Sequence, residues 1–336
     1  MTPGAAPVSG SSASGRLPDF IIGGAMKAGT TTLHQLLARH AGVFIPEREV
    51  HFFCLDDITE HPDFAAPRRG KWVLPDFEAD LGTNLPWYRS LFRNARPDQL
   101  VGEHSTVYLP SSKAPARIAR VLPATKLVFL LRDPVARTYS HYWHRVRWGQ
   151  AVHGFEATLR YAPHTLLTRG FYRRQLEAYL ERIPKQRIQV LIFEEFIREP
   201  QRVLDSVCRF LGIHPGIDLT GVDTHIHRGD AVRFRRVQLL QNRLFRPLLT
   251  LAQRPELPGV PAAKLGVAER LALGLDRKLR GINRANAGYP QMHPGTREFL
   301  AALFARENAG LSELIGVELE RFWPSLRPAT ERGTHA

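Results

Sequence analysis

The chain has 336 residues, enough for one large α/β domain or two smaller ones, and its 43% hydrophobic and 23% charged residues are ordinary for a soluble globular protein. No stretch approaches the roughly 20 consecutive apolar residues of a membrane-spanning helix, which argues against an integral membrane protein. The formal net charge of +14 suits an anionic ligand or partner: a nucleotide, an acidic glycan, a lipid headgroup or nucleic acid. A bias toward arginine spread over solvated faces would give the same number, so charge alone does not select among these partners.

Two local features bear on where the protein works. Residues 1–17 are rich in Ser, Gly, Ala and Pro without an apolar segment, which predicts a disordered tail rather than a signal peptide or an anchor. The two cysteines, Cys54 and Cys208, stand in apolar surroundings without metal-ligand spacing. They are predicted to be reduced core residues, which fits a reducing, cytoplasmic setting.

The segment Asp19–Leu37 has the pattern of a strand, a tight loop and a helix. Gly24 and Gly29 have the separation of a Walker A loop, but Thr30 stands where that motif has its lysine, and Lys27 lies inside the loop instead. The free N–H groups of the helix start favour a phosphate-type anion. The loop is therefore a decayed nucleotide loop or a site for a different anion, with a Gly-rich turn that binds nothing as the plain alternative.

A possible acid–base pair follows the next short strand, predicted at Gly42–Ile45. In an extended backbone Glu49 and His51 project to one side, and Val50 and Phe52 to the other. A carboxylate beside an imidazole can act as a proton-transfer pair. A surface glutamate next to a hydrogen-bonded histidine is the alternative.

Strands and helices alternate as far as a helix over Pro200–Leu211 that Gly212 closes. Residues 55–97 interrupt this pattern with loops and short helices that would shape an acceptor pocket. Three further strands are predicted, at Leu100–Gly102, Lys126–Leu131 and Gln189–Phe193. Five strands alternating with helices predict one α/β domain over residues 18–330, with a central five-stranded parallel sheet and helices on both faces.

Arg132 and Ser140 follow Lys126–Leu131, the strongest buried-strand signal in the chain. Arg132 stands at the carboxyl end of this strand, where open parallel sheets bind their ligands. Asp133 is placed to cap the next helix, and Ser140 lies about two turns along it. Three side chains share the face of Ser140: Arg137, His141 and His144. A salt bridge from Arg132 to Asp133 is the alternative to a ligand-binding role.

Four segments, Lys27–Thr32, Glu49–Phe53, Leu131–Ser140 and Tyr289–Leu319, follow one another along the chain. Together they make the chain resemble sulfotransferases that use 3′-phosphoadenosine 5′-phosphosulfate (PAPS). The resemblance is closest to the carbohydrate branch that includes heparan sulfate N- and 3-O-sulfotransferases and bacterial relatives. Lys27–Thr32 resembles the 5′-phosphosulfate loop, and Glu49–Phe53 resembles the segment with the catalytic base. Leu131–Ser140 resembles the 3′-phosphate element, and Tyr289–Leu319 resembles the C-terminal block.

The resemblance implies roles for individual residues. Lys27 would stabilise the oxygen that leaves with the 5′-phosphate. Glu49 would remove the proton of the acceptor, and His51 would orient Glu49 or the acceptor. Arg132 and Ser140 would hold the 3′-phosphate. The P-loop-like phosphosulfate loop would consist of Lys27, Ala28, Gly29, Thr30, Thr31 and Thr32.

The same resemblance accounts for the position of the loop lysine. A sulfuryl donor has no terminal phosphate chain for a helix-start lysine and a metal to clamp, whereas a lysine inside the loop can reach the bridging oxygen. By analogy with loose, in-line phosphoryl transfer, no metal is expected to be required, and the sequence has no metal-ligand cluster.

The chain also departs from the family pattern. Glu103–Thr106, with His104 second, stands where relatives have Glu-Lys-Ser/Thr-Pro, and a neutral imidazole would not replace the charge of the lysine. The basic C-terminal loop of many members is not evident, and Asn286–Pro290 stands near its place. The absence of the disulfide of secretory-pathway members favours a cytoplasmic, bacterial-type enzyme.

The densest basic run is Arg228–Arg246. A helix with Val237, Leu240 and Leu244 turned inward would present its arginines outward. Three roles are open for it: covering the nucleotide, meeting an anionic acceptor, or lying on a membrane surface as a peripheral contact. A solvated helix face is equally consistent.

We therefore expect transfer of a sulfuryl group from PAPS to a hydroxyl or amine of a carbohydrate or lipid, with no nucleic acid partner. A variant P-loop kinase is an alternative, weakened by the displaced lysine and the lack of a Mg²⁺-binding aspartate after a strand. A non-catalytic protein that binds nucleotides, nucleic acid or acidic glycans is another, suggested by charge alone. The sequence assigns neither the acceptor nor the role of residues 247–284.

Overall fold

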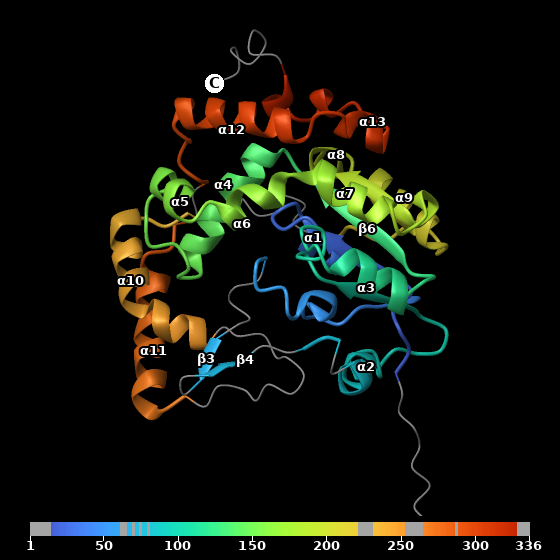
Figure 1. Cartoon of the computed structure of the whole chain (residues 1–336), viewed down its shortest axis with the longest axis horizontal. Coiled ribbons are helices and arrows are strands. Elements are labelled where there is room, and N and C mark those ends of the chain that lie inside the picture. Colours follow the sequence, from blue (N-terminus) through green and yellow to red (C-terminus); the bar gives the residue numbers. More distant parts are fainter. Residues whose placement is uncertain are drawn as a thin grey trace, which may run out of the picture.

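The main sheet of the protein is parallel throughout. The computed structural model describes residues 15–60, 66–68, 71–73, 76–78, 81–220, 231–252, 265–285 and 288–327. Within these residues five strands form one sheet in the order β2-β5-β1-β6-β7 (Figure 1). The strands are β1 (Phe20–Gly24), β2 (Val43–Phe44), β5 (Leu100–His104), β6 (Lys126–Leu131) and β7 (Ile188–Ile192). This confirms the predicted α/β fold with a central five-stranded parallel sheet.

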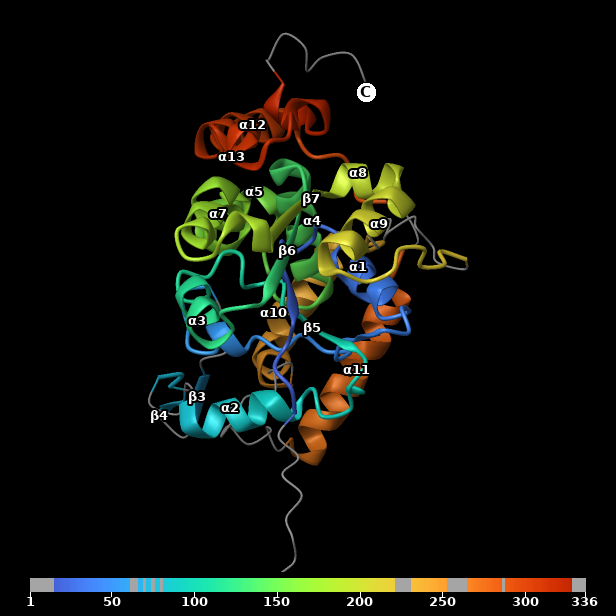
Figure 2. The same cartoon turned by 90° about the vertical axis from the view of Figure 1, so that its right-hand side faces the viewer.

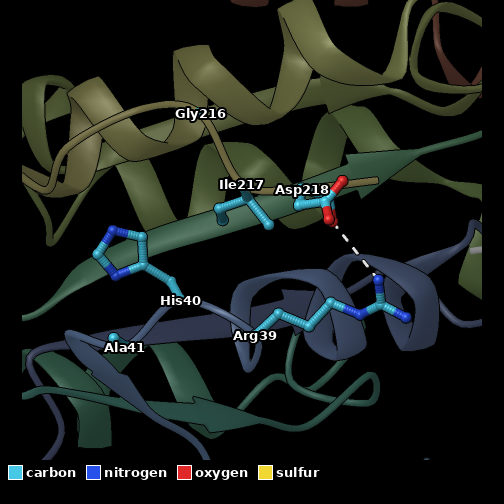
Figure 3. Close-up of a pocket in the computed structure, with 6 residues that line it drawn as sticks. All are labelled: Arg39, His40, Ala41, Gly216, Ile217 and Asp218. Carbon is cyan, nitrogen blue, oxygen red and sulfur yellow. Dashed lines mark hydrogen bonds between the residues drawn. The ribbon is translucent and has the colours of Figure 1, made fainter. Parts of the chain in front are cut away.

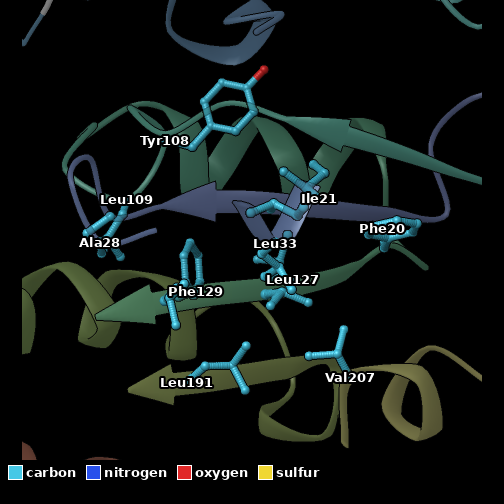
Figure 4. Packing of buried hydrophobic residues seen from close by; sticks show 14 of the residues in the cluster. Phe20, Ile21, Ala28, Leu33, Tyr108, Leu109, Leu127, Phe129, Leu191 and Val207 are labelled. Atoms are coloured by element: carbon cyan, nitrogen blue, oxygen red, sulfur yellow. The ribbon is translucent and has the colours of Figure 1, made fainter. Parts of the chain in front are cut away.

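The central strands β1 and β6 are buried on both faces, as their continuous apolar sequences require. Phe20, Ile21, Leu127 and Phe129 pack together in the core around these strands (Figure 4). A Cβ added to Gly23 would lie 2.5 Å from the Phe129 ring. The close packing of β1 against β6 holds the loop that follows β1 at the carboxyl edge of the sheet.

Helices cover both faces of the sheet, as predicted. Figure 2 shows α3 (Ala114–Val121) and α7 (Tyr172–Leu180) on one side, and α1 (Thr30–Leu37) and α9 (Pro200–Leu211) on the other. The connection from β1 to β2 and the connection from β5 to β6 run in opposite directions along the sheet. Right-handed crossovers in opposite directions place their helices on opposite faces. Gly212, with φ 84°, ends α9 as the sequence predicted.

The remaining elements surround this core. They are β3 (Ala66–Arg68), β4 (Lys71–Val73), α2 (Leu81–Ser90), α4 (Pro134–Arg147), α5 (Phe155–Tyr161), α6 (His164–Leu167), α8 (Phe193–Arg198), α10 (Arg235–Ala252), α11 (Val267–Ile282), α12 (Pro294–Glu307) and α13 (Leu311–Ile315). Short 3₁₀ turns lie at Phe52–Cys54, Thr168–Gly170, Lys185–Arg187, Leu319–Arg321 and Pro324–Leu326. The antiparallel pair β3–β4 lies in the segment predicted to hold only loops and short helices. A second apolar cluster joins α4 to α5 and α12.

The predicted orientation of α10 is wrong. Val237, Leu240 and Leu244 are 58%, 59% and 68% exposed, whereas Gln238 and Asn242 are buried. The physical reason is that the polar face of α10 makes directional hydrogen bonds to its neighbours, and these orient the helix with its apolar stripe outward.

Some of the other sequence predictions can be compared with the structure, and some fall on residues that it does not describe. Cys54 and Cys208 are both buried and unbridged, as expected. Among the described helices, none is both long enough and apolar enough to cross a bilayer. Predictions that fall on residues 1–14, 61–65, 69–70, 74–75, 79–80, 228–230, 253–264, 286–287 or 328–330 lie outside the described residues.

Candidate active site

A pocket of about 140 Å³ lies at the carboxyl edge of the main sheet. It is lined by Met26, Lys27, Gly29, Thr30, Thr31, Thr32, Glu49, Thr106, Arg132, Ser140, His144, Phe193 and Tyr289. Pockets that enclose a drug-sized ligand usually exceed roughly 300 Å³, so this pocket is small by comparison. Most of the residues singled out in the sequence therefore meet at one place.

The loop between β1 and α1 is shaped to bring backbone N–H groups to the pocket. Lys27 and Gly29 adopt left-handed conformations, with φ 69° and 87°. A Cβ on Gly29 would lie 2.8 Å from the Phe193 ring, so the close approach requires glycine. The first hydrogen bond within α1 runs from Leu33 N to Gly29 O at 3.1 Å, which leaves the amides of Thr30–Thr32 available to an anion.

Ala28 is the one residue of the predicted loop whose side chain faces away from this pocket. Its methyl group is fully buried in the core, as Figure 4 shows, and it is not among the lining residues. Any contact of Ala28 with a ligand would therefore come from its backbone.

Lys27 sits among other cations. Burial, followed by repulsion from Arg147 and Arg132, lowers the pKa of Lys27 to about 8, against a smaller opposing effect of Glu49. The ammonium group is thus charged near neutral pH but poorly solvated. A desolvated cation interacts more strongly with a nearby anion than one in water.

Arg132 lies against the loop rather than against Asp133. Its Nη1 donates to the Lys27 carbonyl at 3.1 Å, and its guanidinium carbon is 4.6 Å from the Phe193 ring centroid. Asp133 instead caps α4 by accepting from the Val135 amide at 2.9 Å. Arg132 Nε is buried without a hydrogen-bond partner among the described residues. A buried donor of this kind, at the edge of a pocket, is suited to an anionic ligand.

Glu49 is the acidic group of the pocket, and β5 fixes its position. Its Oε2 accepts from the amide of Thr106 at 3.1 Å and from the Thr106 hydroxyl at 2.8 Å. Burial acts to raise the pKa of Glu49, but His51, His104 and the Thr106 bonds outweigh it and lower the pKa below its ordinary value. The carboxylate is 32% exposed, so it is ionised and within reach of a substrate.

His51 supports Glu49 from outside the pocket lining. The expected extended backbone is wrong here, because His51 has φ 60° and begins a 3₁₀ turn. Its amide donates to Ser105 Oγ at 2.9 Å, which ties the segment to the end of β5. Even so, His51 Nε2 lies 3.8 Å from Glu49 Oε2. Burial lowers the pKa of His51, so near pH 7 it is a neutral neighbour of the carboxylate.

His104 lies outside the pocket lining and adds no positive charge to it near neutral pH. Burial lowers its pKa, its ring centroid is 5.1 Å from that of His34, and it is not among the pocket-lining residues. The positive charge at the site comes instead from Lys27 and Arg132, with Arg147 near enough to affect Lys27.

The face of α4 predicted from helical spacing divides into two environments. Ser140 and His144 line the pocket. Arg137 is fully buried and donates to the Leu166 carbonyl and, at 2.9 Å, to Thr138 Oγ1. Arg137 therefore belongs to the packing of α4 against α6 rather than to the site.

Sequence reasoning gave no role to several lining residues: Thr106, His144, Phe193 and Tyr289. Thr106 lies two residues after β5, and Phe193 directly follows β7, so their position at the carboxyl ends of strands was a usable signal. Burial, then repulsion by Lys27 and Arg147, lowers the pKa of His144 to about 3, which leaves it neutral.

Two other kinds of site come into question in the described part of the chain: a second pocket and a metal site. A shallow hollow of about 400 Å³ lies between the end of α1 and the chain after α9, where Arg39 contacts the Asp218 carbonyl (Figure 3). It is at the amino edge of the sheet, opposite the edge where parallel sheets bind ligands. No group of three or more His, Cys, Asp or Glu among the described residues is placed to hold a metal ion.

Comparison with known proteins extends these observations. The model of a family described as "Sulfotransferase family" matches residues 18–215. The chain is 28% identical over 221 residues to human bifunctional heparan sulfate N-deacetylase/N-sulfotransferase 2, a match that covers 61% of this chain and 23% of that protein. It is 26% identical over 226 residues to human heparan sulfate glucosamine 3-O-sulfotransferase 5, covering 64% and 59%. The chain thus spans less than two thirds of either relative.

A solved structure covers more of the chain. The sulfotransferase from Alicyclobacillus acidocaldarius is 25% identical, with a TM-score of 0.58, and the match covers 91% of this chain and 99% of that one. The similarity therefore reaches beyond residues 18–215 into the C-terminal helices.

Proposed function

Because the chain belongs to the sulfotransferase family, we propose that it transfers a sulfuryl group from PAPS to a hydroxyl or amine of an acceptor. The observation that carries the proposal is the convergence of Lys27, Arg132 and Glu49 on one small pocket at the end of the β1–α1 loop. Two cations and a carboxylate held together in this way suit the transfer of an anionic group to a nucleophile that must lose a proton.

The residues present fit a donor with two separate anionic groups. The amides of Thr30–Thr32 and the loop backbone would hold the 5′-phosphosulfate, and Arg132 with Ser140 would hold the 3′-phosphate. The support for this assignment is the buried Arg132 Nε that lacks a partner in the described part of the chain, and the open helix start of α1. PAPS would supply the activated sulfuryl group.

In the proposed mechanism Glu49 acts on the acceptor and Lys27 acts on the leaving group. Glu49 takes the proton of the acceptor as the acceptor oxygen or nitrogen bonds to sulfur. Lys27 faces the bridging oxygen, which leaves with the 5′-phosphate and gains negative charge as its bond to sulfur breaks. The Thr106 bonds hold Glu49 in place, and the poor solvation of Lys27 strengthens its effect on the leaving oxygen.

The acceptor is proposed as a carbohydrate or a lipid. Both human relatives are named for heparan sulfate, which supports a carbohydrate. The proposed setting is reducing and cytoplasmic, in a bacterial-type enzyme, and the buried, unbridged Cys54 and Cys208 are consistent with it.

The direct test of the function is transfer of labelled sulfate. The full chain is incubated with PAPS labelled in its sulfuryl group and with a cell extract, and the labelled product is isolated and identified. Label should appear in a carbohydrate or lipid fraction, and the same extract incubated with heat-denatured protein is the blank. No labelled product above that blank, with a range of extracts and purified glycans, would contradict the proposal.

Arg132→Ala should weaken binding of adenosine 3′,5′-bisphosphate by about 10- to 150-fold. That range corresponds to the roughly 1.5–3 kcal/mol of a hydrogen bond to a charged group. Titration calorimetry gives the dissociation constants. Arg120→Ala, at an exposed arginine on α3 paired with Glu78, is the matched control and should bind as the parent does. An unchanged affinity in Arg132→Ala would remove the 3′-phosphate role.

A further inference from the structure

The helices α10 and α11 form a hairpin whose polarity is inverted. They pack against each other along one flank of the molecule (Figures 1 and 2). In an ordinary surface helix the apolar stripe faces the core and the polar face meets water. In this hairpin several polar side chains are buried, with Leu249 among them as an apolar one, and most of the large apolar side chains are exposed.

The buried side is held by hydrogen bonds that fix its orientation. Gln241 Nε2 donates to the Asp276 carbonyl at 2.9 Å and to Asp276 Oδ1 at 2.8 Å. Asn242 Nδ2 donates to the carbonyls of Val146 and Ala151 at 2.8 and 2.7 Å. Rotating either helix to bury its apolar stripe would leave these groups without partners, which is costly for buried polar atoms.

The exposed side carries large apolar side chains on both helices. Its members are Phe234, Val237, Leu240 and Leu244 at α10, and Val267, Leu271, Leu275, Leu279 and Ile282 on α11. Leu271 is 70% exposed and Ile282 is 74% exposed. Residues from both helices line a groove of about 330 Å³. Large apolar surfaces of this kind on one face mark an interaction site.

The charges around this surface are almost all positive. The basic residues of the two helices are Arg235, Arg236, Arg243, Arg246, Arg270, Arg277, Lys278 and Arg280. Of the acidic residues in the described hairpin, Asp276 is buried and paired with Arg280 at 2.7 Å, and Glu269 accepts from the Gly266 amide that starts α11. The apolar stripe of α10 thus adjoins arginines that no acidic side chain of α10 offsets.

We propose that the α10–α11 hairpin binds an anionic membrane surface. The leucines would enter the boundary between headgroups and acyl chains, and the arginines would contact lipid phosphates, as in interfacial amphipathic helices. Charge favours this occupant over a second copy of the chain. In a two-fold dimer the same cationic face would meet itself, and the like charges would oppose association.

The hairpin is attached to the helix that forms one wall of the active-site pocket. Asn242 donates to the Val146 carbonyl, and Arg280 donates to the Arg147 carbonyl at 3.0 Å. Both carbonyls lie at the end of α4. Ser140 lies on the same helix, about 10 Å away at 1.5 Å per residue. A membrane-borne acceptor would therefore be close to the pocket. That corollary rests on the proposed function, whereas membrane binding does not.

The experiment is cosedimentation of the full chain with vesicles. Vesicles of phosphatidylcholine with 30% phosphatidylglycerol should bind the protein at least tenfold more tightly than phosphatidylcholine alone, and added salt should reduce the difference. A Leu240→Glu, Leu244→Glu, Leu275→Glu variant should lose at least tenfold in affinity for the anionic vesicles. Phe299→Glu, at an apolar residue 61% exposed on α12, is the matched control and should bind as the parent does.

Further measurements separate the outcomes. Unchanged circular dichroism and bisphosphate affinity would show that the triple variant is folded. Equal binding of the parent to both kinds of vesicle, no binding to either, or full binding by the folded triple variant would overturn the proposal. So would light scattering that shows a dimer dissociated by the same substitutions, because a second copy would then cover the surface.

Discussion

Lys27→Ala should lower kcat by about 10²- to 10³-fold, the loss typical of removing one group that stabilises charge in a transition state. Affinity for adenosine 3′,5′-bisphosphate should change by only a few-fold. The reason is that the ammonium group acts mainly on charge that develops as the sulfur–oxygen bond breaks, and the bisphosphate product lacks that bond. Single-turnover rates and titration calorimetry on the same protein give the two quantities.

The dependence of kcat/KM on pH provides an independent check on the role of Lys27. Lys27 is charged below its pKa of about 8, so kcat/KM of the free enzyme should fall as pH rises through about 8. Lys27→Arg keeps its charge over this range, and whatever activity it retains should lack that decline. A Lys27→Ala protein that turns over at the parental rate, or a parental profile still rising above pH 9, would contradict the role of Lys27.

Glu49→Gln should lower kcat by about 10²- to 10⁴-fold, the range attributed to a general base. The amide has nearly the same shape, and its oxygen can still accept from Thr106, so the melting temperature should change little. In the parent enzyme the base must be deprotonated. Because His51, His104 and the Thr106 bonds lower the pKa of Glu49, the acid limb of the pH–rate profile should lie below the ordinary range of a glutamate carboxyl.

A matched variant at the neighbouring histidine tests which residue is the base. His51→Asn is suitable because asparagine tolerates the left-handed conformation that His51 adopts. His51 does not line the pocket, so this variant should lose much less activity than Glu49→Gln. If Glu49→Gln stays active while His51→Asn is dead, the base is His51 and the assignment to Glu49 is wrong.

The sheet and the main site residues could be predicted because their signals are local. Each strand of the main sheet is a short apolar run, and parallel strands bring their carboxyl ends to one edge. Lys27, Glu49 and Arg132 each follow a strand closely in the sequence, so the topology alone brings them together. Ser140 needed only the helical repeat of α4 in addition.

Other features depend on contacts that no local pattern encodes. The periodicity of α10 identifies an apolar stripe at Val237, Leu240 and Leu244, but it does not say which face is buried. That choice is made by Asn242 and Gln241, which find partners on α4 and α11. Likewise, Tyr289 reaches the pocket from the C-terminal part of the chain, far in sequence from the residues it joins.

The most direct test of a PAPS-type site is a comparison of ligands by thermal unfolding. Adenosine 3′,5′-bisphosphate at about 100 times its Kd should add about 2.7 kcal/mol to the free energy of unfolding. AMP, which lacks the 3′-phosphate expected at Arg132, and ATP with Mg²⁺ should add much less at the same concentration. Greater stabilisation by ATP with Mg²⁺ than by the bisphosphate would contradict the account and favour a variant P-loop kinase.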